Sequence, residues 1–190
     1  MEPDNPLLDD YLLSLVPTDR KPRICFIPTA SGDSEGYSDR FLAAFGPDRA
    51  EASVLSLFKR SVADLDAFVL DQDVVYVGGG NTANLLAIWR LHGLDLALEK
   101  AYRAGVVMAG ISAGMNCWFE ESVTDSFGTQ LAPLHDGLGP LAGSCCPHYD
   151  GAALVFAGTG LAEVVSSRPE AAAYRVEPGG EERLAARWLD

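Results

Sequence analysis

The sequence predicts an α/β fold, a three-layer sandwich with a mostly parallel central sheet, formed by a single domain over residues 1–190. Three observations lead to this prediction. Short apolar strands alternate with stretches of helical periodicity, which is the pattern of βαβ units. Polar or glycine-rich loops follow several of these strands. A chain of 190 residues and 20.3 kDa is also long enough to bury one sizeable core.

The alternating elements follow one another along the first part of the chain. Apolar residues before Arg20 have helical spacing, and Pro17 closes this helix. Beyond it we expect strands at Arg23–Pro28, Ala52–Phe58, Asp73–Val77 and Val106–Ala109, and helices at Asp39–Phe45, Val62–Leu70, Ala83–Leu91 and Leu94–Arg103. After Asp150, strand-like runs at 153–156, 162–166 and 172–176 indicate an antiparallel extension.

Three loops end the first, third and fourth of these strands. Their sequences are TASGDS (Thr29–Ser34), GGGNT (Gly78–Thr82) and GISAG (Gly110–Gly114). Parallel sheets bind ligands at the carboxyl ends of their strands. We therefore expect the three loops to converge on one crevice.

The last of these loops has the pattern of a nucleophile elbow. An apolar strand runs into G-x-S-x-G, so that Ser112 lies on a tight turn between strand and helix. Glycine tolerates both the crowding and the positive φ that such a turn requires. The alternative is an ordinary strand-to-helix turn in which Ser112 caps the helix.

A serine nucleophile needs a base, and histidine is the usual one at neutral pH. His148 is the preferred candidate because it follows a run of small and apolar residues and is preceded by Pro147. His135 lies in a loop of Leu, Pro and Gly, and His92 closes the helix after GGGNT, where capping of the helix end is the simpler role.

The triad also needs a carboxylate to orient the histidine. Asp125 is the best-placed candidate, and Glu120 and Glu121 are rivals that we expect at the end of the elbow helix. An oxyanion hole would combine the N–H of Ala113 with N–H groups of the GGGNT loop. That loop lacks the Lys-Ser/Thr of a P-loop and the third glycine of a dinucleotide fingerprint. Its residues Gly79, Asn81 and Thr82 are candidates for binding the substrate.

Composition excludes several functions. A formal charge of −13 and a pI near 4.5 exclude nucleic acid as a partner, because phosphate binding needs clustered Lys and Arg. No apolar stretch is long enough to span a membrane, and the chain does not start with a basic region followed by an apolar block, so we expect a cytoplasmic protein. We expect no metal and no cofactor, since the cysteines do not have zinc-site spacing; a redox or metal role for Cys145-Cys146 is the alternative.

Taken together, these motifs resemble the peptidase E, or α-aspartyl dipeptidase, family of serine peptidases, which includes relatives of cyanophycinase. The matching segments are IPTASGDS, YVGGGNT, GISAG followed by Asn, VTDS and CPHYD, in this order between residues 23 and 150. The resemblance implies a fold like that of class I glutamine amidotransferases. It also implies Ser112 as nucleophile, Asp125 as triad acid, His148 as base, and Gly80 and Ala113 as oxyanion donors.

The chain departs from this family after Asp150, which runs directly into Gly151. Relatives carry a longer segment there, with arginines and an Asp-Asp-Gly turn that help to enclose the substrate. Either this protein lacks that segment or the segment is omitted between residues 150 and 151, and we favour omission. Without that segment, Arg168 and Arg175 are the weak candidates for pairing with an acidic substrate side chain.

The predicted function is hydrolysis of dipeptides or short peptides through an acyl-enzyme, with an N-terminal aspartate as the substrate preference that the resemblance implies. An esterase of the α/β-hydrolase type is a rival, but only 13 residues separate Ser112 from Asp125, which leaves no room for that fold's further βα units. A non-catalytic module that binds amino acids or acidic peptides is a rival from a different class. A small peptide is the expected partner, and a homodimer is the expected assembly if the chain is not a monomer.

Overall fold

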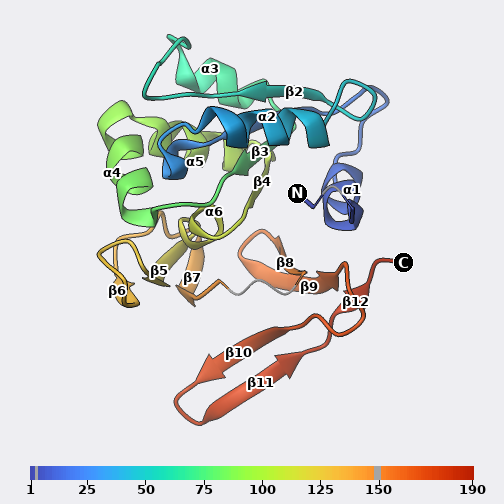
Figure 1. Cartoon of the computed structure of the whole chain (residues 1–190), viewed down its shortest axis with the longest axis vertical. Helices are drawn as coiled ribbons and strands as arrows, with labels where there is room; N and C mark the ends of the chain where they lie inside the picture. The colour runs from blue at the N-terminus through green and yellow to red at the C-terminus, as the bar shows by residue number, and fades with distance from the viewer. Residues whose placement is uncertain (3, 148–150) are drawn as a thin grey trace. The chain divides into compact units, whose positions relative to one another are not determined.

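The computed structural model describes residues 1–2, 4–147 and 151–190 (Figure 1). These residues form two compact units: one comprises Leu15–Pro147, and the other combines Met1–Ser14 with His148–Asp190. The larger unit contains the parallel sheet and the three loops that the sequence predicts at its carboxyl edge. The interpretation of residues 1–190 as a single domain stays a prediction.

The larger unit is built on an entirely parallel sheet of four strands in the order β2-β1-β3-β4. The strands are β1 (Arg23–Ile27), β2 (Glu51–Val54), β3 (Val74–Val77) and β4 (Val107–Gly110). All of β3, and all of β1 after its first residue, is buried, as expected for strands covered on both faces. The predicted strands are confirmed, although β2 ends at Val54 instead of continuing to Phe58.

Helices cover this sheet on both faces. They are α2 (Glu35–Ala44), α3 (Leu65–Leu70), α4 (Thr82–His92) and α5 (Leu94–Arg103). Right-handed crossovers place α2 on one face and α3, α4 and α5 on the other, and Figure 1 shows these helices packed around the strands. This is the α/β sandwich that the sequence predicts. Helix α2 begins at Glu35, earlier than the predicted start at Asp39.

The core beneath α2 is aromatic. Phe26 of β1 stacks on Phe41 of α2 with ring centroids 4.6 Å apart, and Tyr76 of β3 lies 5.6 Å from Phe41. On the other side of the sheet, the fully buried Trp89 of α4 donates a hydrogen bond of 3.1 Å to the hydroxyl of Thr29. Burial of each large apolar side chain contributes about 1.5–3 kcal/mol, so these contacts fix the helices on the sheet.

The chain after the elbow differs from the prediction. The elbow helix α6 covers only Ala113–Asn116, and the chain then forms a second sheet of the order β6-β5-β7. Its strands are β5 (Phe119–Thr124), β6 (Ala132–Leu134) and β7 (Leu141–Cys145). The expectation that Glu120 and Glu121 lie at the end of the elbow helix is therefore wrong, because both belong to β5. Both glutamates are exposed between buried Phe119 and Ser122, at a β-bulge that breaks the strict alternation by which a strand is predicted from its sequence.

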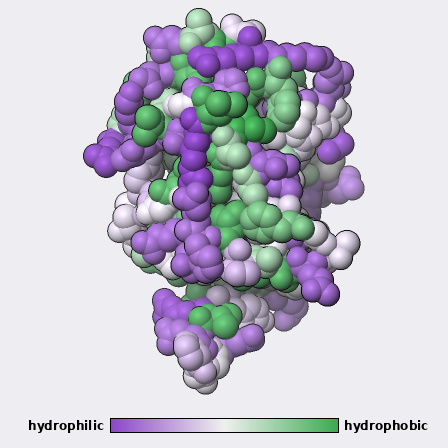
Figure 2. All heavy atoms as spheres, turned by 90° about the vertical axis from the view of Figure 1, so that its left-hand side faces the viewer, coloured by the Kyte–Doolittle hydropathy of each residue, from purple (hydrophilic) through white to green (hydrophobic). Residues whose placement is uncertain are grey.

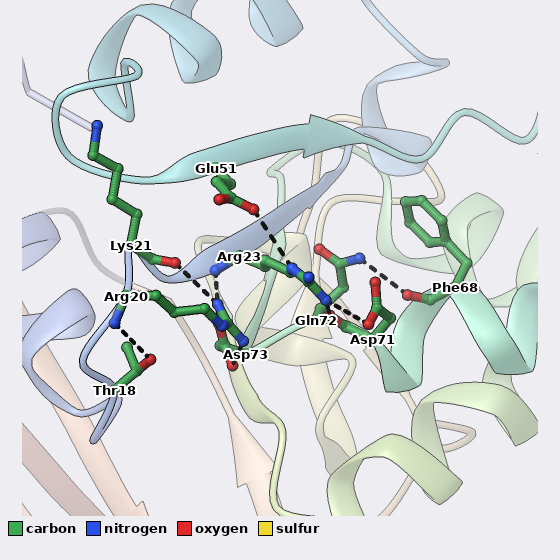
Figure 3. Close-up of polar contacts among 9 residues, drawn as sticks. All are labelled: Thr18, Arg20, Lys21, Arg23, Glu51, Phe68, Asp71, Gln72 and Asp73. Carbon is green, nitrogen blue, oxygen red and sulfur yellow. Dashed lines mark hydrogen bonds and ion pairs between the residues drawn. The ribbon is translucent and has the colours of Figure 1, made fainter.

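An ionic cluster lies at the start of the parallel strands, away from the loops. The carboxylate of Asp73 accepts hydrogen bonds of 2.7 and 3.0 Å from Arg20 and one of 2.7 Å from the backbone N–H of Arg23 (Figure 3). Burial raises the pKa of Asp73, but the hydrogen bonds from Arg20 and Arg23 outweigh it, so this pKa lies below its ordinary value. The cluster joins the chain before β1 to the start of β3.

The smaller unit contains α1 (Leu7–Ser14) and strands that pair with one another. The strands are β8 (Ala152–Ala157), β9 (Gly160–Ser166), β10 (Ala173–Glu177), β11 (Gly180–Leu184) and β12 (Arg187–Trp188). β8 pairs antiparallel with β9, and β10 pairs antiparallel with β11, which confirms the predicted antiparallel extension. Tyr11 of α1 donates a hydrogen bond of 2.5 Å to Glu163 of β9. The predicted omission between residues 150 and 151 involves Asp150, which lies outside the described residues.

Candidate active site

Ser112 has the backbone geometry of a nucleophile elbow. Its φ of 56° and ψ of −117° place it among only two non-glycine residues with positive φ in the described part of the chain. Such a conformation costs about 1–3 kcal/mol and persists only where the surroundings impose it. Ser112 is half-buried between the end of β4 and the start of α6.

The two glycines of G-x-S-x-G impose that conformation. A Cβ atom added to Gly110 would lie 2.0 Å from the carbonyl oxygen of Gly114, and one added to Gly114 would lie 2.2 Å from that of Val77. Any side chain at either position would force the backbone apart. These two glycines let the strand, the turn and the next helix approach closely enough to lift Ser112 above the sheet.

The GGGNT loop lies beside Ser112. A Cβ added to Gly79 would lie 3.2 Å from the Cβ and 3.7 Å from the Oγ of Ser112. Gly80 has φ +143°, and a Cβ there would lie 2.1 Å from the carbonyl oxygen of Ala30. That oxygen accepts a 2.8 Å hydrogen bond from the N–H of Asn81. The GGGNT loop thus lies against both of the other loops, at Ala30 and at Ser112. That the three loops line one crevice stays a prediction.

The two predicted oxyanion donors are backbone N–H groups, one in the GGGNT loop and one directly after Ser112. Within the described residues, the N–H groups of Gly80 and Ala113 make no hydrogen bond. The N–H of Gly79, in contrast, donates to the hydroxyl of Tyr37 at 3.2 Å. An unpaired pair of N–H groups beside a hydroxyl is the donor set that an oxyanion hole requires.

Tyr37 is a site residue that the sequence analysis missed. Its ring packs edge-on against Phe26 at 5.0 Å, and the guanidinium of Arg40 lies 5.2 Å from its centroid. Its hydroxyl supports the loop at Gly79. The only sequence signal was an aromatic residue in the expected loop after TASGD, and such a position does not by itself predict a contact.

Asp125 lies on an exposed turn directly after β5. Its neighbours fix that turn: the hydroxyls of Thr124 and Ser126 are 2.8 Å apart, and the N–H of Ser126 donates to Thr124 Oγ1 at 3.2 Å. The rival carboxylates have other partners. Glu121 lies 3.0 Å from His135, and Glu120 accepts a 2.9 Å hydrogen bond from the N–H of Gly143.

The structure describes two of the three histidines that are candidates for the base. His148 lies outside the described residues. His135 is an exposed side chain beside Glu121, and His92 is the last residue of α4, which ends at Gly93 in the left-handed conformation. The capping role expected for His92 is thus filled by Gly93, whose N–H bonds to the carbonyls of Trp89 and Arg90.

The side chains of Asn81 and Thr82 have structural contacts. Asn81 caps α4, because its Oδ1 accepts a 2.8 Å hydrogen bond from the N–H of Asn84, while its Nδ2 donates to the carbonyl of Ser126 at 2.9 Å. The hydroxyl of Thr82 is buried and lies 3.5 Å from both Asn116 and Thr124. Binding of substrate by Gly79, Asn81 and Thr82 stays a prediction.

The buried thiols are poor nucleophiles. Burial raises the pKa of Cys25 and of Cys145 to about 12, and it raises that of Cys117 well above its ordinary value. Among the described residues, no group of three or more His, Cys, Asp or Glu side chains could hold a metal ion. In the same residues, no helix has both the length and the apolar character needed to cross a membrane. Ser112 is thus the candidate nucleophile of the site.

Two hollows border α4. Figure 2 shows the side of the molecule that lies at the left of Figure 1, where α4 is drawn. Hydrophobic side chains form a strip on this face between hydrophilic ones. The first hollow has a volume of about 260 Å³ and is lined by Thr29, Ala30, Gly32, Phe58, Asn84, Ala87 and Ile88. Because the carbonyl of Ala30 is in contact with Gly80, this hollow adjoins the loop of the candidate oxyanion hole.

Comparison with known proteins identifies the family. The model of peptidase family S51 matches residues 1–179. The chain belongs to peptidase family S51. The resemblance to peptidase E that the motifs suggest is therefore confirmed, and the chain is a serine peptidase similar to peptidase E.

Relatives within family S51 cover different shares of the chain. It is 50% identical over 202 residues to an uncharacterized peptidase, YgaJ, of Bacillus subtilis, covering 93% of this chain and 86% of the relative. It is 31% identical over 128 residues to peptidase E of Streptomyces coelicolor, covering 67% of this chain and 51% of that protein. The match to YgaJ spans more positions than the 190 residues present here, so YgaJ carries residues without a counterpart in this chain.

Solved structures share the fold. A peptidase from an acI-B1 actinobacterium has a TM-score of 0.56 at 24% identity, with 70% of this chain and 59% of that chain covered. A protein described as a peptidase E from Listeria monocytogenes has a TM-score of 0.53 at 21% identity, with 68% and 67% covered. The α/β, class I glutamine amidotransferase-like fold that the resemblance implies is confirmed.

Proposed function

We propose that this S51 peptidase hydrolyses dipeptides or other short peptides through an acyl-enzyme formed on Ser112. The observation that carries the proposal is the strained Ser112, held at φ 56° next to the N–H of Ala113 and beside the loop of Gly80, two donors that make no hydrogen bond within the part of the chain that the structure describes. A binding pocket has no need of a strained serine, whereas a nucleophile must stand clear of the sheet to reach a carbonyl carbon.

In the proposed mechanism, Ser112 Oγ attacks the scissile carbonyl while His148 takes its proton. The N–H groups of Gly80 and Ala113 stabilise the oxyanion, an effect worth about 2.7–4 kcal/mol for one donor in comparable sites. His148 then protonates the leaving amine, and water hydrolyses the acyl-enzyme by the same steps. Asp125 orients His148 and stabilises its protonated form.

The roles of His148 and Asp125 rest on different grounds. Asp125 is supported by its fixed turn and by the engagement of both rival glutamates with other groups. His148 is supported by the CPHYD motif alone. The short spacing between Ser112 and Asp125, which contains only α6 and β5, is unlike that of an α/β-hydrolase esterase and favours the peptidase.

An N-terminal aspartate is the proposed substrate preference, by similarity to the α-aspartyl dipeptidases that the motifs resemble. We also propose a cytoplasmic location, for which the four free cysteines are the supporting observation. Assembly as a homodimer is a further proposal that light scattering would test.

Labelling with a fluorophosphonate tests the nucleophile. The wild-type protein should be labelled at Ser112, and Ser112→Ala should not be labelled although it unfolds at the same urea concentration. Hydrolysis of a panel of X-Leu dipeptides then gives the side-chain preference, with Asp-Leu expected to be cleaved fastest. An unlabelled wild-type protein that binds these dipeptides without cleaving them would show a binding module instead.

A further inference from the structure

A cluster of polar side chains lies where three segments of the candidate site meet. Thr82 at the start of α4, Asn116 at the end of α6 and Thr124 at the end of β5 are 1%, 3% and 4% exposed. Asn116 Nδ2 donates to Thr82 Oγ1, and Thr124 Oγ1 donates to the same oxygen, both at 3.5 Å. One buried hydroxyl thus joins the helix after Ser112 to the strand before Asp125.

Ser126 extends this cluster to the start of α4. Its hydroxyl lies 2.8 Å from Thr124 Oγ1 and accepts a 3.2 Å hydrogen bond from the N–H of Ala83. Its carbonyl accepts a 2.9 Å hydrogen bond from Asn81 Nδ2. The turn that carries Asp125 is therefore attached on both sides to the segment that follows Gly80.

The bonds through Thr82 contribute little to stability. These hydrogen bonds are at the long end of the range, and Asn116 Oδ1 is buried without a partner among the described residues. A buried polar atom left unpaired costs about 1–3 kcal/mol, whereas apolar groups of the same shape can replace both partners of a bond at almost no cost. A role in stability alone does not account for these side chains.

The cluster does account for the relative placement of the site residues. From the contacts above, we infer that Thr82, Asn116, Thr124 and Ser126 are positioning residues that hold the turn of Asp125 in register with Ser112 and Gly80. This inference rests on the proposed function. The hydrogen bonds of Ser126, at 2.8, 2.9 and 3.2 Å, fix the turn against the start of α4, and the longer contacts of Thr82 link it to α6. A displacement of about 1 Å can lower a catalytic rate about 100-fold.

The central experiment replaces both partners of the buried bond. Val has the shape of Thr, and Leu has the same number of heavy atoms as Asn, so Thr82→Val/Asn116→Leu removes the polar atoms and leaves the packing. We expect kcat on Asp-Leu to fall about 10- to 100-fold with KM changed less than about threefold, because the buried hydroxyl of Thr82 faces Asn116 and Thr124 and not the substrate. A large rise in KM with an unchanged kcat would instead support binding of substrate by Thr82 and contradict its positioning role. Stability in urea should stay within about 1 kcal/mol of wild type.

The pH profile separates positioning from a purely structural role. In the proposed triad the Asp125 carboxylate favours the protonated form of the base, and a displaced turn weakens that effect. The acid-side midpoint of kcat/KM should therefore move to lower pH in the double variant. The half-buried Ser126→Ala should show the same shift without a change in the core, which keeps the test valid if the double variant does not fold.

Two controls complete the set. Thr82→Ser retains the hydroxyl and should restore most of the rate. Ser122→Ala should have wild-type kinetics, because Ser122 is buried on the same strand as Thr124 but its hydroxyl makes no hydrogen bond in the described part of the chain. Wild-type rates and pH profiles in both the double variant and Ser126→Ala would overturn the positioning role alone. A wild-type protein that neither labels at Ser112 nor cleaves dipeptides would overturn the proposed function, and this inference with it.

Discussion

Replacing Gly80 by alanine separates two effects that a glycine in this loop can have. The first is conformational, because φ +143° is strained for any residue with a Cβ atom. The second is steric, because that Cβ would lie 2.1 Å from the carbonyl oxygen of Ala30. Gly180, at the start of β11, has nearly the same φ of +142° with nothing within 4 Å. Gly180→Ala therefore shows the conformational effect alone.

The magnitude follows from the distance. Real Cβ atoms do not approach within 3.0 Å of other heavy atoms, so Gly80→Ala must move the GGGNT loop away from Ala30 by about 1 Å. The hydrogen bond from the Asn81 N–H to Ala30 O would stretch or break, at about 0.5–1.5 kcal/mol, in addition to about 1–3 kcal/mol of backbone strain. The Gly80 N–H would leave the 2.7–3.1 Å range that an oxyanion requires, which predicts a fall in kcat of about 100-fold.

The assay compares kcat on Asp-Leu, the rate of fluorophosphonate labelling and urea unfolding for the two variants. Gly180→Ala should be destabilised only by the backbone strain that the new Cβ introduces, and it should keep its activity. Gly80→Ala should lose more stability and most of its activity, with a slower rate of labelling at Ser112. Equal stabilities in the two variants, together with wild-type labelling of Gly80→Ala, would refute the close contact with Ala30 and the oxyanion role of Gly80.

Three further predictions concern other residues. Asp125→Asn should lower kcat at least about 100-fold with little change in stability, and a near-normal rate in this variant would return the acid role to Glu120 or Glu121. Tyr37→Phe should leave the Gly79 N–H without its acceptor and cost about 1 kcal/mol in urea unfolding; an unchanged stability would mean that water replaces the hydroxyl. Asp73→Asn should lower stability at pH 7 by about 1–2 kcal/mol. Because the pKa of Asp73 is lowered by folding, its contribution is present above its unfolded pKa of about 4 and lost as the pH falls through the folded pKa, so the stabilities of wild type and variant should converge below that folded pKa.

The parallel sheet and its loops could be predicted because their residue types match the positions that the fold gives them. The strand Val74–Val77 is apolar at every position and is buried at every position. Gly80, Gly110 and Gly114 stand where a side chain would collide with a backbone carbonyl, so the glycine pattern in the sequence records a real steric demand. Such steric constraints involve short glycine motifs, so they can be predicted from the sequence without knowledge of the fold.

The segment after the elbow could not be predicted in the same way. The strand pattern of 119–124 is short, and its partners β6 and β7 are themselves brief and rich in Gly, Pro and Ala. Helix α6 ends at Asn116, and the chain then continues into β5. Where the helix ends is set by the pairing of β5 with the distant strand β7 and not by helix propensity. For the same reason Glu120 and Glu121 were expected on a helix when they lie on a strand.

The VTDS motif shows that residues next to a candidate catalytic acid in the sequence can be the ones that hold it in place. Asp125 carries the predicted chemistry, but the hydroxyls on either side of it make the contacts to Thr82 and Ala83. Small hydroxyl residues flanking a candidate acid can close a turn on themselves and still reach a neighbouring helix start. Hydroxyl residues on both sides of Asp125 predict that its turn is held in place. They do not predict which helix the turn contacts, because that depends on the length and direction of β5. Comparing Ser126→Ala with Asp125→Asn therefore tests whether the acid acts alone or through the turn that holds it.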